Sequence, residues 1–273
     1  MYGRSFRQIA CSIPHSFAHI RTATVFTALG VSLMIVTAGC NKNATTKSET
    51  PITYAQIDPA TAGTVSGTIH FSGQAPKPIV IDMAQDPACA YASKEPNYTE
   101  QYVVHDDKLA NVFVYVKDGL GNKIYPASST PVVLDQKGCR YVPHVIGVMA
   151  GQPVEFRNSD PTMHNVHPAP TTPGNQEFDI SQPPMDGTQR HAFAKPELMI
   201  PVRCNNHPWM EAFINVASNP FFAVSGADGH FDIKGLPPGT YTIEAVQEKL
   251  GSKSMQVTVP AKSTVQADFT FSK

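Results

Sequence analysis

Three side chains that can bind a metal lie within one short segment, between Pro201 and Met210. They are the thiol of Cys204, the imidazole of His207 and the thioether of Met210, in the order Cys-x2-His-x2-Met. The preceding residues, 197–203, have the pattern of a strand that runs directly into the cysteine. This places Cys204 at a strand end and the other two ligands on the following loop, so that all three can converge on one ion.

This donor set favours copper. A thiolate with an imidazole suits several metals, but a thioether adds nothing for zinc and is the weak axial ligand of an electron-transfer copper site. Such a site needs a second histidine, and His164 and His167 both lie upstream. Because these two are three positions apart on a predicted strand, they face opposite sides and only one can reach the ion. The alternative, a zinc site, would need a second cysteine or an acidic ligand, and Cys89 and Cys139 show no zinc-ribbon spacing.

Other chemistry has little support in the sequence. Cys204 is flanked by Arg203 and Asn205 rather than by histidines, which argues against a multicopper oxidase. His144 and His191 are expected to be ordinary polar residues on strands or loops. No nucleophile–base pair or acid pair is visible, so the protein is predicted not to be an enzyme.

The N-terminus indicates an export signal over residues 1–39. Arginines precede an apolar run, Ala23 to Thr37, which is short for a membrane span and is followed by polar residues. Thr37 to Cys40 resembles the lipobox of bacterial lipoproteins, although threonine stands where leucine is usual. The resemblance implies cleavage before Cys40, a lipid on its sulfur, and a protein anchored on the periplasmic or cell-surface side of a bacterial membrane. An uncleaved single-pass anchor is the alternative.

Composition agrees with an exported β-rich protein. Residues 40–63 are polar and predict a flexible linker. The chain is 41% hydrophobic, which is enough for a core, and its 24 prolines and 18 glycines favour turns over long helices. A formal net charge of −1 gives no indication of nucleic-acid binding.

The five cysteines divide into different roles. Cys11 leaves with the signal, Cys40 carries the lipid and Cys204 binds the metal. Cys89 and Cys139 remain, and in an oxidising compartment an isolated pair is most simply a disulfide. Two buried thiols are the alternative.

Short runs of alternating polarity begin at Gly63 and continue to the end of the chain, which predicts an all-β fold. Residues 82–108 have no regular pattern, and residues 168–190 form a long loop rich in proline and glycine. Asp228-Gly229 predicts a hairpin between flanking strands. The expected strands are 64–71, 79–81, 111–117, 131–135, 142–148, 153–158, 187–193, 197–203, 213–217, 221–224, 230–233, 240–245, 254–259 and 264–271.

Residues 131–217 resemble the cupredoxins, the family of blue copper proteins that includes plastocyanin, azurin and amicyanin. The resemblance is carried by Ala150 to Asp160, by His164-Asn165-Val166, by the Cys204–Met210 segment and by Phe213 to Val216. It implies a Greek-key β-sandwich and one type 1 copper held by His164, Cys204, His207 and Met210. It also implies that Asn165 braces the ligand loop by hydrogen bonding, and that the ion exchanges single electrons with a redox protein partner.

Residues 221–273 resemble the carboxypeptidase regulatory-like, transthyretin-related β-sandwich module. The segment from Ala227 to Tyr241 carries this resemblance, which implies packing or docking and no catalysis. The expected domains are a copper domain, 64–218, and a module, 219–273. In the alternative arrangement, strands from 64–117 complete the module and the copper part is inserted between them.

Pro208 and Trp209 follow the ligand His207 and are predicted to form an apolar rim that contacts the partner. The alternative is that Trp209 is a core aromatic. The predicted function is therefore an exported, lipid-anchored carrier of single electrons. A copper-delivery protein and a surface interaction protein with a structural metal site are the two alternatives.

Overall fold

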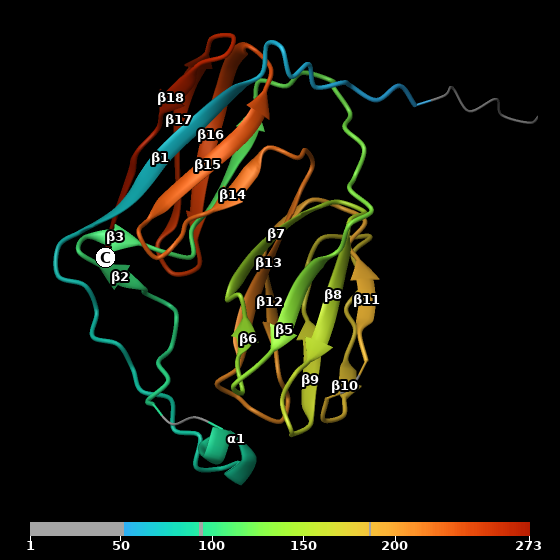
Figure 1. Cartoon of the computed structure of the whole chain (residues 1–273), viewed down its shortest axis with the longest axis vertical. Coiled ribbons are helices and arrows are strands. Elements are labelled where there is room, and N and C mark those ends of the chain that lie inside the picture. Colours follow the sequence, from blue (N-terminus) through green and yellow to red (C-terminus); the bar gives the residue numbers. More distant parts are fainter. Residues whose placement is uncertain (1–51, 93–94, 186) are drawn as a thin grey trace, which may run out of the picture. The chain divides into compact units, whose positions relative to one another are not determined.

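The computed structural model describes residues 52–92, 95–185 and 187–273 (Figure 1). The predicted signal peptide, Cys40 and the first half of the predicted linker, up to residue 51, lie outside these residues. Apart from one short helix, α1 (Pro87–Ala92), the regular elements of the described chain are strands. The prediction of an all-β fold is confirmed. In this part of the chain no helix has the length and hydrophobicity needed to cross a membrane.

The strands between residues 132 and 217 form two sheets, which we call the central sandwich. The first sheet has the order β10 (Ile180–Gln182), β9 (His164–Pro168), β12 (Glu197–Arg203), β13 (Glu211–Ala217) and β7 (Val145–Met149). The second has the order β11 (Gln189–Ala192), β8 (Pro153–Asn158), β5 (Val132–Gln136) and β6 (Tyr141–Val142).

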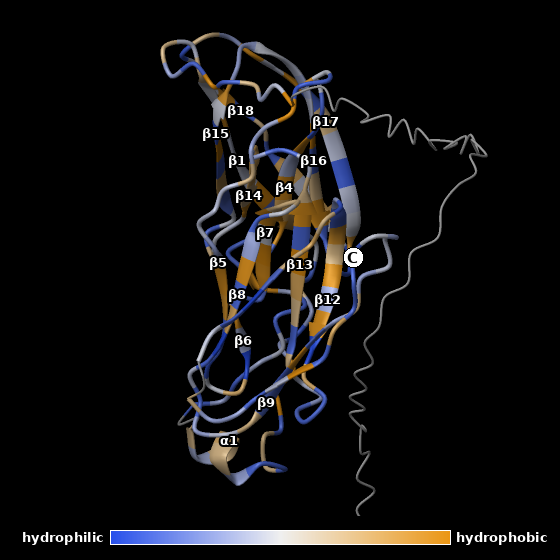
Figure 2. Cartoon of the chain, turned by 90° about the vertical axis from the view of Figure 1, so that its right-hand side faces the viewer, coloured by the Kyte–Doolittle hydropathy of each residue, from blue (hydrophilic) through white to orange (hydrophobic). Residues whose placement is uncertain are grey.

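The core of the central sandwich lies between these two sheets. Val202, Ile214 and Phe156 are fully or almost fully buried there. β12 and β13 carry mostly hydrophobic residues (Figure 2). They pair antiparallel, with Arg203 opposite Glu211, so residues 204–210 form the connection between them. The core strands therefore hold both ends of the candidate ligand loop.

A second pair of sheets, the terminal sandwich, is built from strands near both ends of the described chain. In one sheet β1 (Gly63–Ser72) pairs with β15 (His230–Leu236), β18 (Thr264–Gln266), β19 (Phe269–Ser272) and β3 (Lys108–Leu109), which in turn pairs with β2 (Val104–His105). The other sheet has the order β14 (Phe222–Val224), β4 (Phe113–Asp118), β16 (Gly239–Gln247) and β17 (Gly251–Val259). Thus β1 and β4 precede the central sandwich in sequence but pair with strands that follow it.

The two sandwiches contact each other through β4, β7 and β13. Phe113, Val145 and Phe213 form a small buried cluster there. Gly147 lies on β7, and a Cβ at this position would come within 2.6 Å of Phe113 and 2.8 Å of Phe222. The absence of a side chain at Gly147 therefore allows the aromatic rings to pack directly against the strand backbone.

Two predictions made from local sequence patterns, a strand at 79–81 and a hairpin at Asp228-Gly229, are not met. The predicted strand 79–81 contributes only an isolated bridge between Val80 and Tyr98. The turn at Asp228-Gly229 forms, but β14 pairs with β4 and β15 pairs with β1, so the predicted hairpin is wrong. The chain crosses from one sheet to the other at this turn, so β14 and β15 belong to different sheets.

His144 connects the central sandwich to the loop after β16. Its Nδ1 lies 3.0 Å from the carbonyl oxygen of Glu211 and its Nε2 lies 3.2 Å from Glu248. Burial opposes protonation of this ring, but the bond to the Glu248 carboxylate outweighs it and the pKa of His144 is raised above its usual 6.5. Protonated His144 therefore stabilises the fold below about pH 6.5, and this contribution is lost as the pH rises through the folded-state pKa.

We expect His144→Asn to lower the free energy of unfolding of the metal-free protein by roughly 2 kcal/mol at pH 6 and by less at pH 9, because the charge-assisted bond is lost. Urea titrations at both pH values measure the difference. His230→Asn, at a half-exposed position, is the control. An equal destabilisation at both pH values would contradict the expectation.

Candidate metal centre

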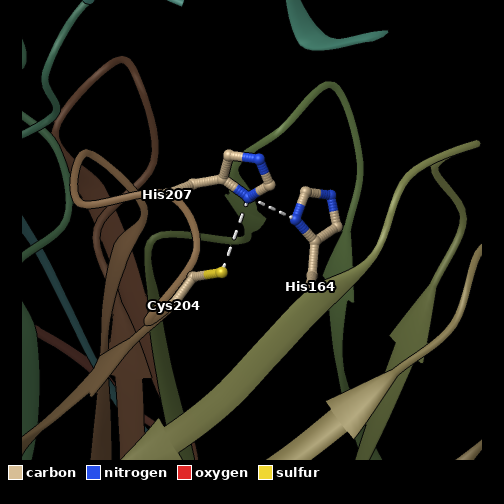
Figure 3. Close-up of side chains that lie close together, drawn as sticks. All are labelled: His164, Cys204 and His207. Atoms are coloured by element: carbon tan, nitrogen blue, oxygen red, sulfur yellow. Dashed lines mark hydrogen bonds between the residues drawn. The ribbon is translucent and has the colours of Figure 1, made fainter. Parts of the chain in front are cut away.

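Three predicted ligands converge at the end of the central sandwich (Figure 3). His164 begins β9, Cys204 follows β12, and His207 lies on the loop between β12 and β13. The Nδ1 atoms of the two histidines are 2.9 Å apart, and Cys204 Sγ lies 3.6 Å from His207 Nδ1. All three side chains are almost fully buried, with exposed fractions of 0%, 3% and 3%. One donor atom from each lies within 4.8 Å of the other two.

The ligand loop is closed by its own backbone. The N–H of Met210 donates to the carbonyl of His207 at 2.9 Å, and the N–H of Cys204 donates to the carbonyl of Met210 at 3.4 Å. Met210 is 1% exposed and belongs to the same hydrophobic cluster as Cys204. The fourth predicted ligand is therefore fixed in the core, at the end of the loop that carries Cys204 and His207.

The surroundings of Cys204 favour its thiolate. The main-chain N–H of Asn165 donates to Sγ at 3.2 Å. Burial would raise the pKa of this thiol, but hydrogen bonds from His164 and from the N–H groups of Asn165 and Asn206 lower it to about 7. The thiolate, which is the form that binds metals, is thus accessible near neutral pH.

The outer nitrogen of each histidine is held by a carboxylate. His164 Nε2 lies 2.9 Å from Asp160 Oδ2, and His207 Nε2 lies 2.8 Å from Asp86 Oδ2. Burial alone would lower the pKa of His164, but Asp160 and the nearby Cys204 raise it to about 9. Because a carboxylate accepts from each Nε2, both rings direct Nδ1 towards the thiol, as metal-binding histidines do.

This donor set fits copper. Two imidazoles and one thiolate around a common point, with a weak thioether in addition, are the ligands of an electron-transfer copper site. Two other groups of side chains also lie close together, one containing Cys89 and one containing Cys139. These two cysteines form a disulfide, so neither can offer a thiolate. Cys204 is the free cysteine of the described chain.

Asn165 and His167 lie beside the centre. The side chain of Asn165 donates to Asp179 at 3.0 Å, and Asp179 also accepts from Asn205 at 2.7 Å. The side chain thus reaches the ligand loop through Asp179, whereas the main-chain N–H contacts Cys204 directly. His167 bonds to Asn205 at 3.2 Å and to Glu177 at 2.7 Å.

Pro208 and Trp209 border the centre in different ways. Pro208 is exposed, whereas Trp209 is partly buried and packs against the core of the central sandwich. The indole N–H donates to the carbonyl of Cys139 at 3.0 Å, and its ring centroid lies 5.1 Å from that of His207. Trp209 therefore has a packing role and also lies beside His207, a predicted ligand.

Sequence reasoning missed the two carboxylates. Asp160 belongs to the conspicuous Asn158-Ser159-Asp160 segment, and its four-residue spacing from His164 was an available signal. Asp86 lies in a region without any regular pattern, 121 residues from His207. No local signal connects it to the ligand loop, because tertiary packing alone brings it there.

Comparisons of the sequence with known protein families and with curated proteins found no match. Among solved structures, a copper-containing nitrite reductase (NirK) from Thermus scotoductus SA-01 is similar at 22% identity over 37% of this chain and 26% of that chain, with a TM-score of 0.31. Amicyanin from Paracoccus versutus is similar at 20% identity over 38% of this chain and 97% of that chain, with a TM-score of 0.29. A purple cupredoxin from Nitrosopumilus maritimus is similar at 18% identity over 32% of this chain and 99% of that chain, with a TM-score of 0.25. These likenesses are partial and distant, so function is inferred from the site.

Proposed function

We propose that the protein is a cupredoxin that carries single electrons at one type 1 copper held by His164, Cys204, His207 and Met210. The observation that carries this proposal is the convergence of two imidazole Nδ1 atoms and one thiol sulfur in a buried site. Copper bound by these residues supplies a one-electron couple between Cu(I) and Cu(II).

The surrounding residues keep the ligands in place during electron exchange. Asp160 and Asp86 fix the rings of the two histidines, and the N–H of Asn165 fixes the sulfur of Cys204. Strands β12 and β13 hold both ends of the ligand loop. Because these contacts hold the donors independently of the ion, little has to rearrange when its charge changes.

The proposal is tested by adding Cu(II) to the purified, metal-free protein. One equivalent is expected to give an intense visible absorption and an electron paramagnetic resonance spectrum with a narrow copper hyperfine splitting. Reductant should bleach the colour, and an oxidised partner should restore it. A protein that folds but stays colourless with Cu(II) would contradict the proposal.

Copper delivery is the less favoured alternative. Transfer of an ion to another protein requires an accessible ligand, whereas the three donor residues are at most 3% exposed. A closed site suits an ion that stays bound while electrons pass. Rapid loss of Cu(I) to an acceptor protein, without electron exchange, would favour delivery.

We further propose that the protein is exported and anchored by lipid on Cys40, where it meets a redox protein partner. The arginine-preceded apolar run and the Thr37–Cys40 segment support this location. We also propose that the terminal sandwich is a transthyretin-like module with the copper domain inserted into it, and that it serves packing or docking. The pairing of β1 with β15 and of β4 with β16 supports this arrangement.

Trp209→Ala is expected to retain the visible copper absorption and to slow electron exchange with the partner by roughly tenfold, the effect of losing an aromatic anchor at a docking surface. Stopped-flow mixing with the partner measures the rate. Tyr54→Ala, at an exposed aromatic in the segment that precedes β1, is the control. Loss of copper with unchanged exchange in the remaining holoprotein would instead assign Trp209 to the core.

A further inference from the structure

Asp86 lies outside the central sandwich yet contacts a proposed ligand. It immediately precedes α1, and its Oδ1 accepts the N–H of Ala88 at 2.7 Å and that of Cys89 at 3.4 Å. Its Oδ2 lies 2.8 Å from His207 Nε2. One carboxylate oxygen therefore caps the helix, and the other is presented to the histidine.

Several contacts hold this carboxylate in place. Thr162 donates to Asp86 Oδ2 at 3.2 Å from the loop before β9. Cys89, three residues after Asp86, forms the disulfide with Cys139. The N–H of Cys139 in turn donates at 2.8 Å to Asp160, the carboxylate on the other ligand histidine. The disulfide thus joins the segment that carries Asp86 to Cys139, whose N–H holds the Asp160 carboxylate.

The outer edge of His207 is consequently covered by protein. The residue is 3% exposed, and a sulfur of the disulfide lies 3.7 Å from its Nε2. A carboxylate on the outer nitrogen of a ligand histidine fixes the tautomer and the ring orientation, and it raises the basicity of the metal-binding nitrogen. A stronger donor and a nearby negative charge both favour Cu(II) over Cu(I).

We propose that Asp86 is a positioning residue that fixes the His207 ring through Nε2 and lowers the reduction potential of the copper site. This inference rests on the proposed function. It also implies that electrons do not reach the ion through a solvent-exposed His207 ring, because Asp86 and the disulfide cover the outer edge of that ring. The surface there is a shallow pocket lined by Gln85, Asp86, Thr162, Met163, Asn206, His207 and Trp209.

The test is the reduction potential of the copper-loaded full chain with Asp86→Asn. Asparagine keeps the size and the capping oxygen of Asp86 but removes the charge. The potential is expected to rise by about 59 mV, which corresponds to a roughly tenfold shift towards Cu(I). Asp82→Asn is the matched control, because Asp82 lies in the same segment and its carboxylate accepts the N–H of Ala84 at 3.0 Å, and it is expected to leave the potential unchanged. Asp86→Glu should recover part of the wild-type value.

A second readout needs no copper. Ring ¹⁵N resonances of the metal-free protein report which nitrogen of His207 carries the proton. Wild type should carry it on Nε2, whereas Asp86→Ala should lose this preference and Asp82→Ala should not.

The two readouts separate the possible failures. If wild type gives no blue copper spectrum, the proposed function fails, and the ¹⁵N measurement still decides whether Asp86 orients the ring. If wild type is blue but Asp86→Asn and Asp82→Asn share its potential, the tuning role of Asp86 is overturned. An unchanged His207 proton position in Asp86→Ala overturns the positioning role.

Discussion

Cys204→Ser is expected to abolish the intense visible absorption of the copper-loaded protein and to weaken copper binding more than the roughly 10–100-fold that loss of an outer contact costs. A serine hydroxyl is a hard donor that stays protonated at neutral pH, so it supplies neither the charge-transfer band nor the strong bond of a thiolate. Absorption spectra and competition with a copper chelator measure the two effects. The near-equal volume of serine should leave the far-ultraviolet circular dichroism unchanged.

The matched control for this variant is His167→Asn. His167 lies three residues after His164, but its ring bonds to Asn205 and Glu177. We expect this control to retain the colour, whereas His164→Asn should lose it. A blue Cys204→Ser protein, or loss of colour in His167→Asn alone, would show that the proposed ligand set is wrong.

Removal of the disulfide by Cys89→Ala and Cys139→Ala is expected to lower the free energy of unfolding by about 4 kcal/mol. The bond closes a loop with a sequence separation of 50 residues, and the cost follows from the chain entropy that such a closure removes from the unfolded state. Denaturant titration of the metal-free protein, with non-reducing mass analysis of the wild type, makes the comparison. Because both cysteines are replaced by alanine, no free thiol is left at either of these buried positions.

An unchanged unfolding midpoint in the double variant would contradict this expectation. Cys204→Ala provides a control for the loss of a buried sulfur without the loss of a cross-link. A larger effect for the disulfide variant than for this control would assign the difference to the constraint on the chain.

Much of the fold follows from local pattern. The alternating run 153–158 became β8, and the run 197–203, which is hydrophobic in its middle, became β12. The prediction of a hairpin at Asp228-Gly229 was wrong because a turn signal is local, whereas β14 and β15 pair with β4 and β1, which lie far away in sequence. The short helix α1 carries too few residues for a helical period to be visible.

The candidate site, like the fold, could be predicted only in part from the sequence. The spacing Cys204-x2-His207 and the upstream His164 lead to three side chains that the structure brings together. Their role as copper ligands, and that of Met210, stays a prediction. Asp86 could not be found from sequence, because its contact with His207 depends on how a region without secondary-structure pattern packs against the ligand loop.

The terminal sandwich has a consequence for the order in which the chain can fold. Its first strand bonds to residues near the end of the protein, as Thr68 does to Asp268 across 200 positions. During synthesis the strands of the central sandwich are complete before β15 to β19 emerge. The early strands β1 and β4 therefore cannot pair with β15 and β16 until the central sandwich has been synthesised. Once the middle of the chain has folded, it brings Tyr115 opposite Phe222 and shortens the loop that remains to be closed. The central sandwich thus brings together the two groups of strands, before and after it in sequence, that form the terminal sandwich.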